Sequence, residues 1–236
     1  MKRILTGLFL TIISLTGFSQ GTQTGQTRAG SAPQPEAIAR EQITRLHDGA
    51  LLVRLHTKNK SITALRNIGK TKEADEVEKK QAEYNLNIVS AFKLNFSFCP
   101  VYFFYSDYST NIIEKQFDQV VFLNDSLRAD PNINFDFKSF LTADFGIIEQ
   151  DTARYFDYKS LEMDTTGAAT LTNNYYGGAD MSFGALIIRS DKLMQLRDPF
   201  PYYVRTFDSL PTARNLGKVV KKMNTKLNDF YRQANK

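Results

Sequence analysis

Three short apolar runs in the first half of the chain predict buried strands. They are residues 49–57 (GALLVRLHT), 101–105 (VYFFY) and 120–123 (VVFL). Apolar runs of this length, bounded by polar residues, are typical of strands covered on both faces. A helical stretch over residues 60–95, divided by Gly69, separates the first two runs, and a short helical stretch over 109–117 precedes the third. This alternation predicts parallel strands joined by right-handed crossovers.

The second half of the chain is less regular. Residues 141–149 and 183–189 are further strand candidates, and residues 150–182 have the composition of a loop or insertion. Residues 212–233 place apolar side chains at helical spacing and predict a long amphipathic helix. The sequence therefore predicts an α/β fold: a single domain with a central, mostly parallel or mixed sheet of about five strands, flanked by helices and ending in an amphipathic helix.

The N-terminus has the three parts of a secretory signal peptide. Two basic residues come first, an uncharged apolar run covers residues 4–18, and Gly17 and Ser19 supply a small-x-small cleavage site. A membrane anchor is the alternative, but a run of about 15 residues is shorter than the roughly 20 that a spanning helix needs. We therefore expect a signal peptide over residues 1–19, a flexible polar linker over 20–36 and the domain over 37–236. The protein is expected to be exported, periplasmic or secreted, with no transmembrane segment in the mature chain.

Charge is unevenly distributed along the chain. The full sequence carries a net charge of +5, and seven basic residues against one acid fall between Thr212 and Lys236. The overall excess is too small to indicate a nucleic-acid partner, which needs a concentrated basic face. The basic C-terminal helix has three interpretations. It is a solvated outer face, a surface for an anionic envelope polymer or lipid, or a contact with the acidic surface of a partner, such as an envelope protein or residues 144–164 of another copy.

The sequence lacks the short motifs of familiar catalytic classes. It has no phosphate-binding Gly-rich loop and no Gly-x-Ser-x-Gly elbow, and Asp144-Phe145-Gly146 matches the kinase metal-binding triplet without its partner motifs. His47 and His56 are the only histidines, and no acidic residues stand at ligand spacing from them, so we expect no metal and no cofactor. Cys99 is the single cysteine and lies among apolar residues, which indicates a buried structural thiol and no internal disulfide.

Polar residues follow each of the first three predicted strands and form the candidate ligand-binding site. They are Lys58 and Lys60 after the first strand, Ser106 and Asp107 after the second, and Asn124 and Asp125 after the third. Ligands of open α/β sheets bind beyond the carboxyl ends of parallel strands, so these side chains would meet at one edge. The alternative is that they only cap turns and helices, as such residues do in any strand-to-helix loop.

These observations favour a non-catalytic binding or structural module of the bacterial cell envelope. The alternative is a small envelope hydrolase or ligand-binding enzyme with its site at the carboxyl ends of strands 49–57, 101–105 and 120–123. The enzyme hypothesis requires Asp107, Asp125 and His56 to open into one pocket, whereas the module hypothesis predicts separate structural roles for the two carboxylates.

Overall fold

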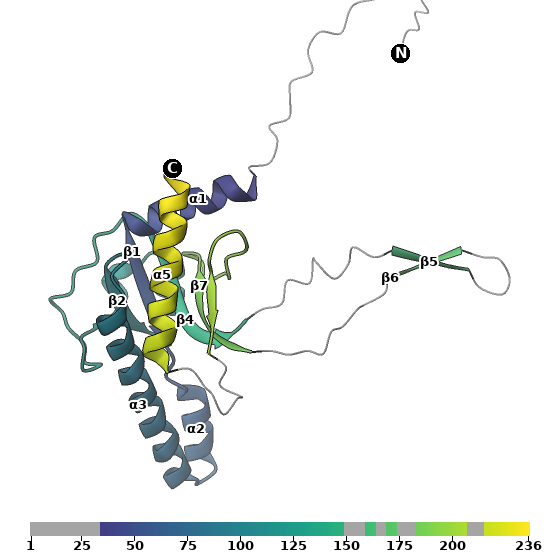
Figure 1. The fold of residues 1–236 in the computed structure, drawn as a ribbon. Coiled ribbons are helices and arrows are strands. Elements are labelled where there is room, and N and C mark those ends of the chain that lie inside the picture. The colour runs from purple at the N-terminus through teal and green to yellow at the C-terminus, as the bar shows by residue number, and fades with distance from the viewer. Residues whose placement is uncertain (1–33, 149–158, 164–168, 174–182, 207–214) are drawn as a thin grey trace, which may run out of the picture. The chain divides into compact units, whose positions relative to one another are not determined.

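The computed structural model describes residues 34–148, 159–163, 169–173, 183–206 and 215–236. In this part of the chain, six strands form a mixed sheet in the order β3-β2-β1-β4-β7-β8 (Figure 1). The strands are β1 Ala50–Leu55, β2 Val101–Tyr105, β3 Phe122–Leu123, β4 Phe140–Ile147, β7 Gly184–Arg189 and β8 Tyr203–Arg205. Two further strands, β5 Lys159–Met163 and β6 Ala169–Asn173, pair antiparallel with each other within the predicted loop or insertion, most of which lies outside the described residues.

Helices flank the sheet as predicted. They are α1 Pro35–His47, α2 Asn59–Asn67, α3 Thr71–Asn95, α4 Ser109–Ile113 and α5 Leu216–Ala234. Gly69 separates α2 from α3 at φ 79°, a left-handed conformation that glycine adopts without strain. No helix was predicted over residues 35–47, so α1 is an addition to the predicted elements. The α/β class, the single domain and the C-terminal helix are confirmed, with six strands where about five were expected.

The direction of β3 differs from the prediction. Strands β2, β1 and β4 run parallel, but β3 pairs antiparallel with β2, placing Leu123 opposite Phe103. The preceding helix, α4, has five residues and is therefore about 7.5 Å long, whereas β2 is about 17 Å long. Because α4 does not carry the chain back along the full strand, β3 starts near the edge where β2 ends and runs the opposite way.

The two faces of the sheet are covered by different elements. Leu51, Val53 and Leu55 of β1 pack in a core with residues of α1, α3 and α5. The alternate residues Ala50 and Leu52 belong to a second core that includes side chains of α4 and the segment before β4. Burial on both faces explains why the strand sequences are apolar without alternation. Helix α3 of the β1-to-β2 connection packs in the first core, and α4 of the β2-to-β4 connection packs in the second, so these two connections cover opposite faces of the sheet.

Candidate functional site

The six predicted site residues lie at two opposite edges of the sheet. Lys58, Lys60, Ser106 and Asp107 follow the parallel strands β1 and β2 and share the carboxyl edge. Asn124 and Asp125 follow the antiparallel strand β3, so they lie beside the start of β2, where they line a pocket with Pro100 and Val101. The premise that all six meet at one edge is therefore wrong, because it depended on a parallel third strand.

At the carboxyl edge, Asp107 ties two loops together. Thr57 Oγ1 donates a hydrogen bond to Asp107 Oδ1 at 3.0 Å, and Asn59 Nδ2 donates to Oδ2 at 2.7 Å. Lys58 lies between these donors in the sequence and has a backbone φ of 54°. The side chains of Lys58 and Lys60 are both exposed. Ser106 begins the 3₁₀ turn Ser106–Tyr108. Both oxygens of the Asp107 carboxylate are thus used to hold the β1–α2 loop against the end of β2.

A buried charged cluster next to this edge was not found from the sequence. Asp144 of β4 is 1% exposed and pairs with two arginines: its Oδ1 lies 3.0 Å from Arg189 Nε, and its Oδ2 accepts a hydrogen bond from Arg54 Nη2. His56 Nε2 lies 3.9 Å from Asp144 Oδ2. The sequence did contain a signal, because Arg54, Asp144 and Arg189 are each the only charged residue of a mostly apolar strand.

The cluster lies where open α/β sheets usually bind ligands. The crossover that leaves β1 leads to β2 over one face of the sheet, and the crossover that arrives at β4 comes from β2 over the other face. The neighbouring strands β1 and β4 therefore form the topological switch point of the parallel strands. Among the described residues, Arg54 and Arg189 both pair with this one carboxylate. Arg54 Nε is buried and has no hydrogen-bond partner among the described residues.

The environment of His56 favours its neutral form. Burial lowers the pKa of His56 below its usual value of 6.5, and the positive charge of Arg54 lowers it further, against the smaller opposing effect of Asp144. The side chain is 41% exposed. A neutral, half-exposed imidazole can accept a proton or a hydrogen bond from a bound molecule.

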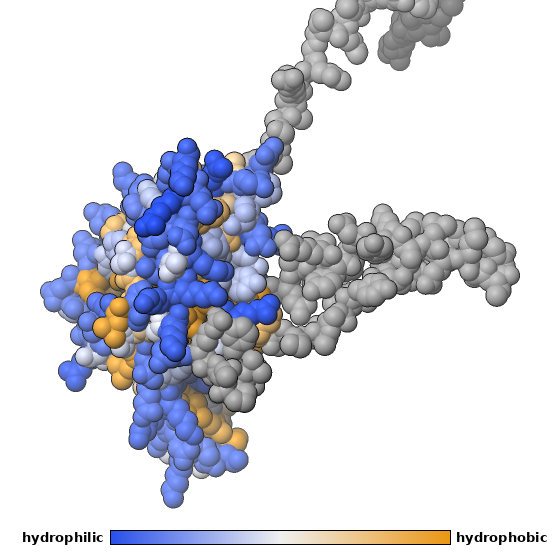
Figure 2. All heavy atoms as spheres, viewed as in Figure 1, coloured by the Kyte–Doolittle hydropathy of each residue, from blue (hydrophilic) through white to orange (hydrophobic). Residues whose placement is uncertain are grey.

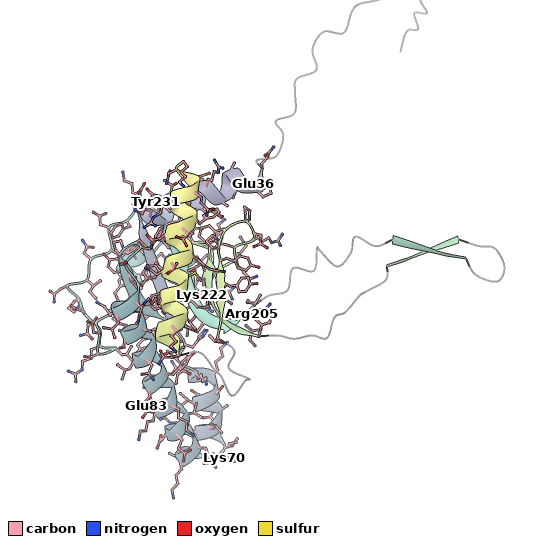
Figure 3. The ribbon with its side chains drawn as sticks, in the orientation of Figure 1. Glu36, Lys70, Glu83, Arg205, Lys222 and Tyr231 are labelled. Carbon is pink, nitrogen blue, oxygen red and sulfur yellow. The ribbon has the colours of Figure 1, made fainter. Side chains whose placement is uncertain are left out.

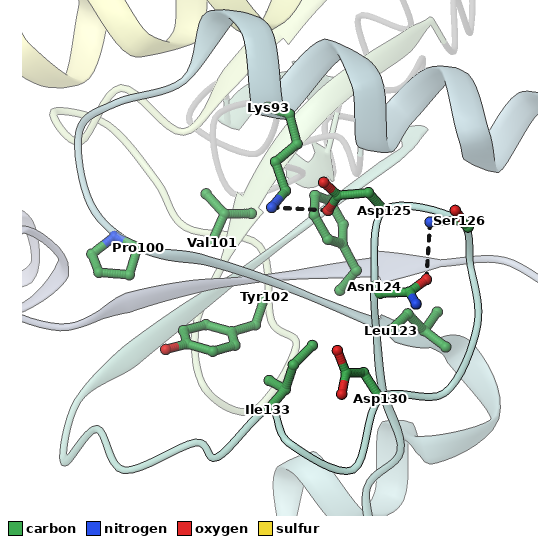
Figure 4. Close-up of a pocket in the computed structure, with 11 residues that line it drawn as sticks. Lys93, Pro100, Val101, Tyr102, Leu123, Asn124, Asp125, Ser126, Asp130 and Ile133 are labelled. Carbon is green, nitrogen blue, oxygen red and sulfur yellow. Dashed lines mark hydrogen bonds and ion pairs between the residues drawn. The ribbon is translucent and has the colours of Figure 1, made fainter.

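Asn124 and Asp125 belong to a separate pocket of about 550 Å³ (Figure 4). Lys93 of α3 reaches over this pocket, and its Nζ lies 2.9 Å from Asp125 Oδ1. Asn124 Oδ1 accepts hydrogen bonds from the backbone N–H groups of Ser126 at 2.9 Å and Arg128 at 3.0 Å, so it stabilises its own turn. Asp125 and Asp107 therefore have different partners and face different parts of the molecule.

The C-terminal helix α5 separates its apolar and basic residues onto two faces. Val219, Val220, Met223 and Leu227 are fully buried against the core. The exposed basic residues of this segment are Lys218, Lys221, Lys222 and Arg232 of α5, and Lys236, which follows the helix. We refer to these five residues as the α5 basic face. Lys222 lies on the outside of the helix in Figure 3, and the surface over α5 is largely hydrophilic in Figure 2.

The remaining chemistry is limited in the part of the chain that the structure describes. Burial raises the pKa of Cys99 to about 12, which keeps the thiol protonated at physiological pH. No group of three or more His, Cys, Asp or Glu side chains among the described residues is placed to hold a metal ion. None of the described helices combines the length and apolar character needed to cross a membrane.

The architecture defines the class of protein as a single α/β domain with a mixed sheet and a basic C-terminal helix. No known protein family, curated protein or solved structure matches this chain. A functional assignment therefore depends on the geometry of the α5 basic face and of the strand edges.

Proposed function

We propose that this chain is an exported, non-catalytic binding module of the cell envelope, and that its α5 basic face binds an anionic envelope polymer. The observation that carries the proposal is the row of exposed lysine and arginine side chains on one side of α5. The export part rests on the signal-peptide pattern of residues 1–19, which predicts a mature chain that starts at Gln20. The intact mass of the exported protein tests that start site.

The size of the α5 basic face favours a polymer over a small ion. Lys218 and Arg232 stand 14 residues apart on α5, which corresponds to about 21 Å along the helix, and Asp229 is the one exposed acid between them. A row of charges of this length can bind several groups of one chain at once, and such binding is weakened by salt. A membrane surface is less suited, because Val219, Met223 and Leu227 are already buried and cannot enter the lipid.

The positions of the two carboxylates support a non-catalytic role. An enzyme of the kind considered above needs Asp107 and Asp125 in one pocket, but they follow strands that end at opposite edges. Asp107 accepts hydrogen bonds from Thr57 and Asn59, and Asp125 pairs with Lys93. The two carboxylates therefore have different partners and do not form one catalytic site, which agrees with the module hypothesis.

The test is a binding assay of the protein against an anionic polysaccharide, polygalacturonate, with neutral dextran of similar length as reference. We expect saturable binding to the anionic polymer that weakens as salt rises. Replacing Lys218, Lys221 and Lys222 together by Gln should weaken it roughly tenfold or more, because three of the contacting charges are lost. The matched control replaces Lys70, Lys72 and Lys79, three exposed lysines at the start of α3, and should retain most of the affinity.

Two results would contradict the proposal. If both triple variants lost the same affinity for the anionic polymer, the binding would be a general attraction to a basic protein, with no special role for α5. Binding to anionic phospholipid vesicles with no binding to the polymer would assign the basic face to a membrane surface.

A second candidate function, a ligand-binding enzyme at the carboxyl edge, is favoured by one observation. His56 is a half-exposed imidazole with a lowered pKa at the switch point between β1 and β4. Such a group can act as a general base at neutral pH. A thermal-shift screen with nucleotides, sugar phosphates and amino acids tests this candidate, since a ligand at a hundred times its Kd adds about 2.7 kcal/mol of stability. The candidate requires a hit that is lost in His56→Gln.

A further inference from the structure

The pocket beside β2 and β3 has the size and lining of a small-molecule site. Its volume of about 550 Å³ lies within the range of about 300–1,000 Å³ that ligand pockets occupy. Its lining comes from the end of α3, from β2 and from the segment after β3. In Figure 4, Lys93 and Asp125 lie on one side of the opening and Asp130 and Ile133 on the other, with Tyr102 and Asn124 between them.

One wall of this pocket is apolar and held in place by aromatic packing. The Tyr102 ring makes edge contacts with Phe135 at 5.3 Å and with Phe122 at 5.9 Å between ring centroids. Ile133 extends the same wall, whereas Val101 packs on the opposite face of β2. Because the neighbouring rings fix Tyr102, the wall is already formed before a ligand arrives, which reduces the entropy lost on binding.

The polar groups around the opening retain hydrogen-bonding capacity. Asp130 uses Oδ1 to accept two hydrogen bonds from Asn132, which leaves Oδ2 without a partner among the described residues. Asp125 pairs only with Lys93 in this part of the chain, and these side chains are 68% and 51% exposed. An exposed ion pair contributes little to stability, so its groups can turn to a ligand at small cost.

The charges of the pocket select against an anionic ligand. Lys93 is balanced by Asp125, and Asp130 adds a further negative charge. Carboxylates accept strong hydrogen bonds from hydroxyl groups, and the lysine and the Asn124 amide donate to hydroxyl oxygens. A molecule that suits this lining has an apolar face for Tyr102 and Ile133 and hydroxyl groups around its edge.

We infer that this pocket binds a neutral sugar ring, as a monosaccharide or as the end of an oligosaccharide. The C–H face of the ring packs on Tyr102 and Ile133, and its hydroxyls bond to Asp125, Asp130 and Lys93. The groups involved do not belong to α5, so the site does not depend on the proposed binding of an anionic polymer.

The experiment is an NMR titration of the full chain with neutral oligosaccharides at millimolar concentration. The probes are short oligomers of glucose, mannose, xylose and N-acetylglucosamine. We expect at least one to give saturable shifts of the Asn124 side-chain amide and of backbone amides near Tyr102. Asp125→Asn and Asp130→Asn should each weaken the binding roughly tenfold, since each removes a charged hydrogen-bond acceptor.

A matched pair on the same helix provides the control. Lys80 and Glu76 form an exposed ion pair on α3, 3.6 Å apart, well before Lys93. Lys93→Met should weaken sugar binding, whereas Lys80→Met and Glu76→Gln should not, and all three should unfold at nearly the same temperature. The inference is overturned if none of the neutral oligomers gives saturable shifts at the pocket. It is overturned equally if binding survives both aspartate substitutions, or if free amino acids bind at these groups and sugars do not.

Discussion

At the scale of single residues, Asp144 is the side chain on which the charge balance of the buried cluster depends. It is the carboxylate that pairs with both Arg54 and Arg189, and it is almost fully buried. Asp144→Asn removes that charge and leaves two arginines with little solvent to screen them. Loss of one partner of a buried ion pair costs about 3–5 kcal/mol, so we expect a decrease in unfolding free energy of that order, measured by urea denaturation.

Asp125→Asn is the control for this prediction. The Asp125–Lys93 pair has a comparable distance, 2.9 Å, but both side chains are more than half exposed. Its loss should cost less than about 1 kcal/mol. If the two variants lost similar amounts of stability, the Arg54–Asp144–Arg189 cluster would not be the buried network that its geometry indicates.

His56 should make the stability of the protein depend on pH. Burial and the nearby Arg54 lower its pKa in the folded state, with smaller contributions from Arg189 and Lys58 in the same direction and an opposing one from Asp144. As the pH falls below about 6.5, the unfolded chain takes up a proton at His56 before the folded chain does. The unfolding free energy is therefore highest above that pH and decreases as the pH falls toward the folded-state pKa.

The measurement compares urea unfolding at about pH 7.5 and about pH 5.5 for the natural chain and for His56→Gln. The variant should lose less stability over this interval, because its side chain does not titrate. An unchanged pH dependence in His56→Gln would refute the assignment.

At the scale of elements, the sequence predicts the positions of most strands and helices, which depend on neighbouring residues. It does not predict the direction of a strand, which depends on the length of the preceding connection. Strands β1, β2, β4 and β7 were predicted because each is an apolar run bounded by polar residues, and the break at Gly69 was predicted because its conformation suits glycine. The direction of β3 was missed, since it depends on how far α4 carries the chain. Helix α1 was missed because only Ala39, Ile43 and Leu46 of its residues are buried, so its apolar pattern is sparse.

In the candidate site, too, the sequence predicts contacts between neighbouring parallel strands but not pairings between distant residues. Lys58, Lys60, Ser106 and Asp107 share an edge because β1 and β2 are parallel neighbours, which strand-helix-strand alternation does predict. The buried cluster was missed because it joins residues 90 and 45 positions apart, and only the pairing of β1 with β4 and β4 with β7 brings them together. A lone charge within a buried strand predicts that a partner exists, but it does not say which residue the partner is.

At the scale of the whole molecule, the first and last elements of the unit Gln34–Lys236 pack against each other. His47, the last residue of α1, stacks on Tyr231 of α5 with ring centroids 4.0 Å apart and planes 9° apart. Phe98, which follows α3, meets both rings edge-on, at 5.4 Å and 5.9 Å. The contact joins sequence-distant helices on the same face of the sheet, so α1 and α5 should unfold together with the sheet that both helices cover.

A double-mutant cycle of His47→Ala and Tyr231→Ala tests this coupling. Aromatic pairs contribute about 0.5–1.5 kcal/mol beyond their buried area, so the loss in the double variant should be smaller than the sum of the single losses by that amount. Hydrogen exchange in the natural chain should give central amides of α1 and α5 the same opening free energy, because one cooperative transition exposes both. If the single losses were additive and α1 exchanged at a lower free energy than α5, the stacked pair would be a surface contact, and α1 would open independently of the sheet.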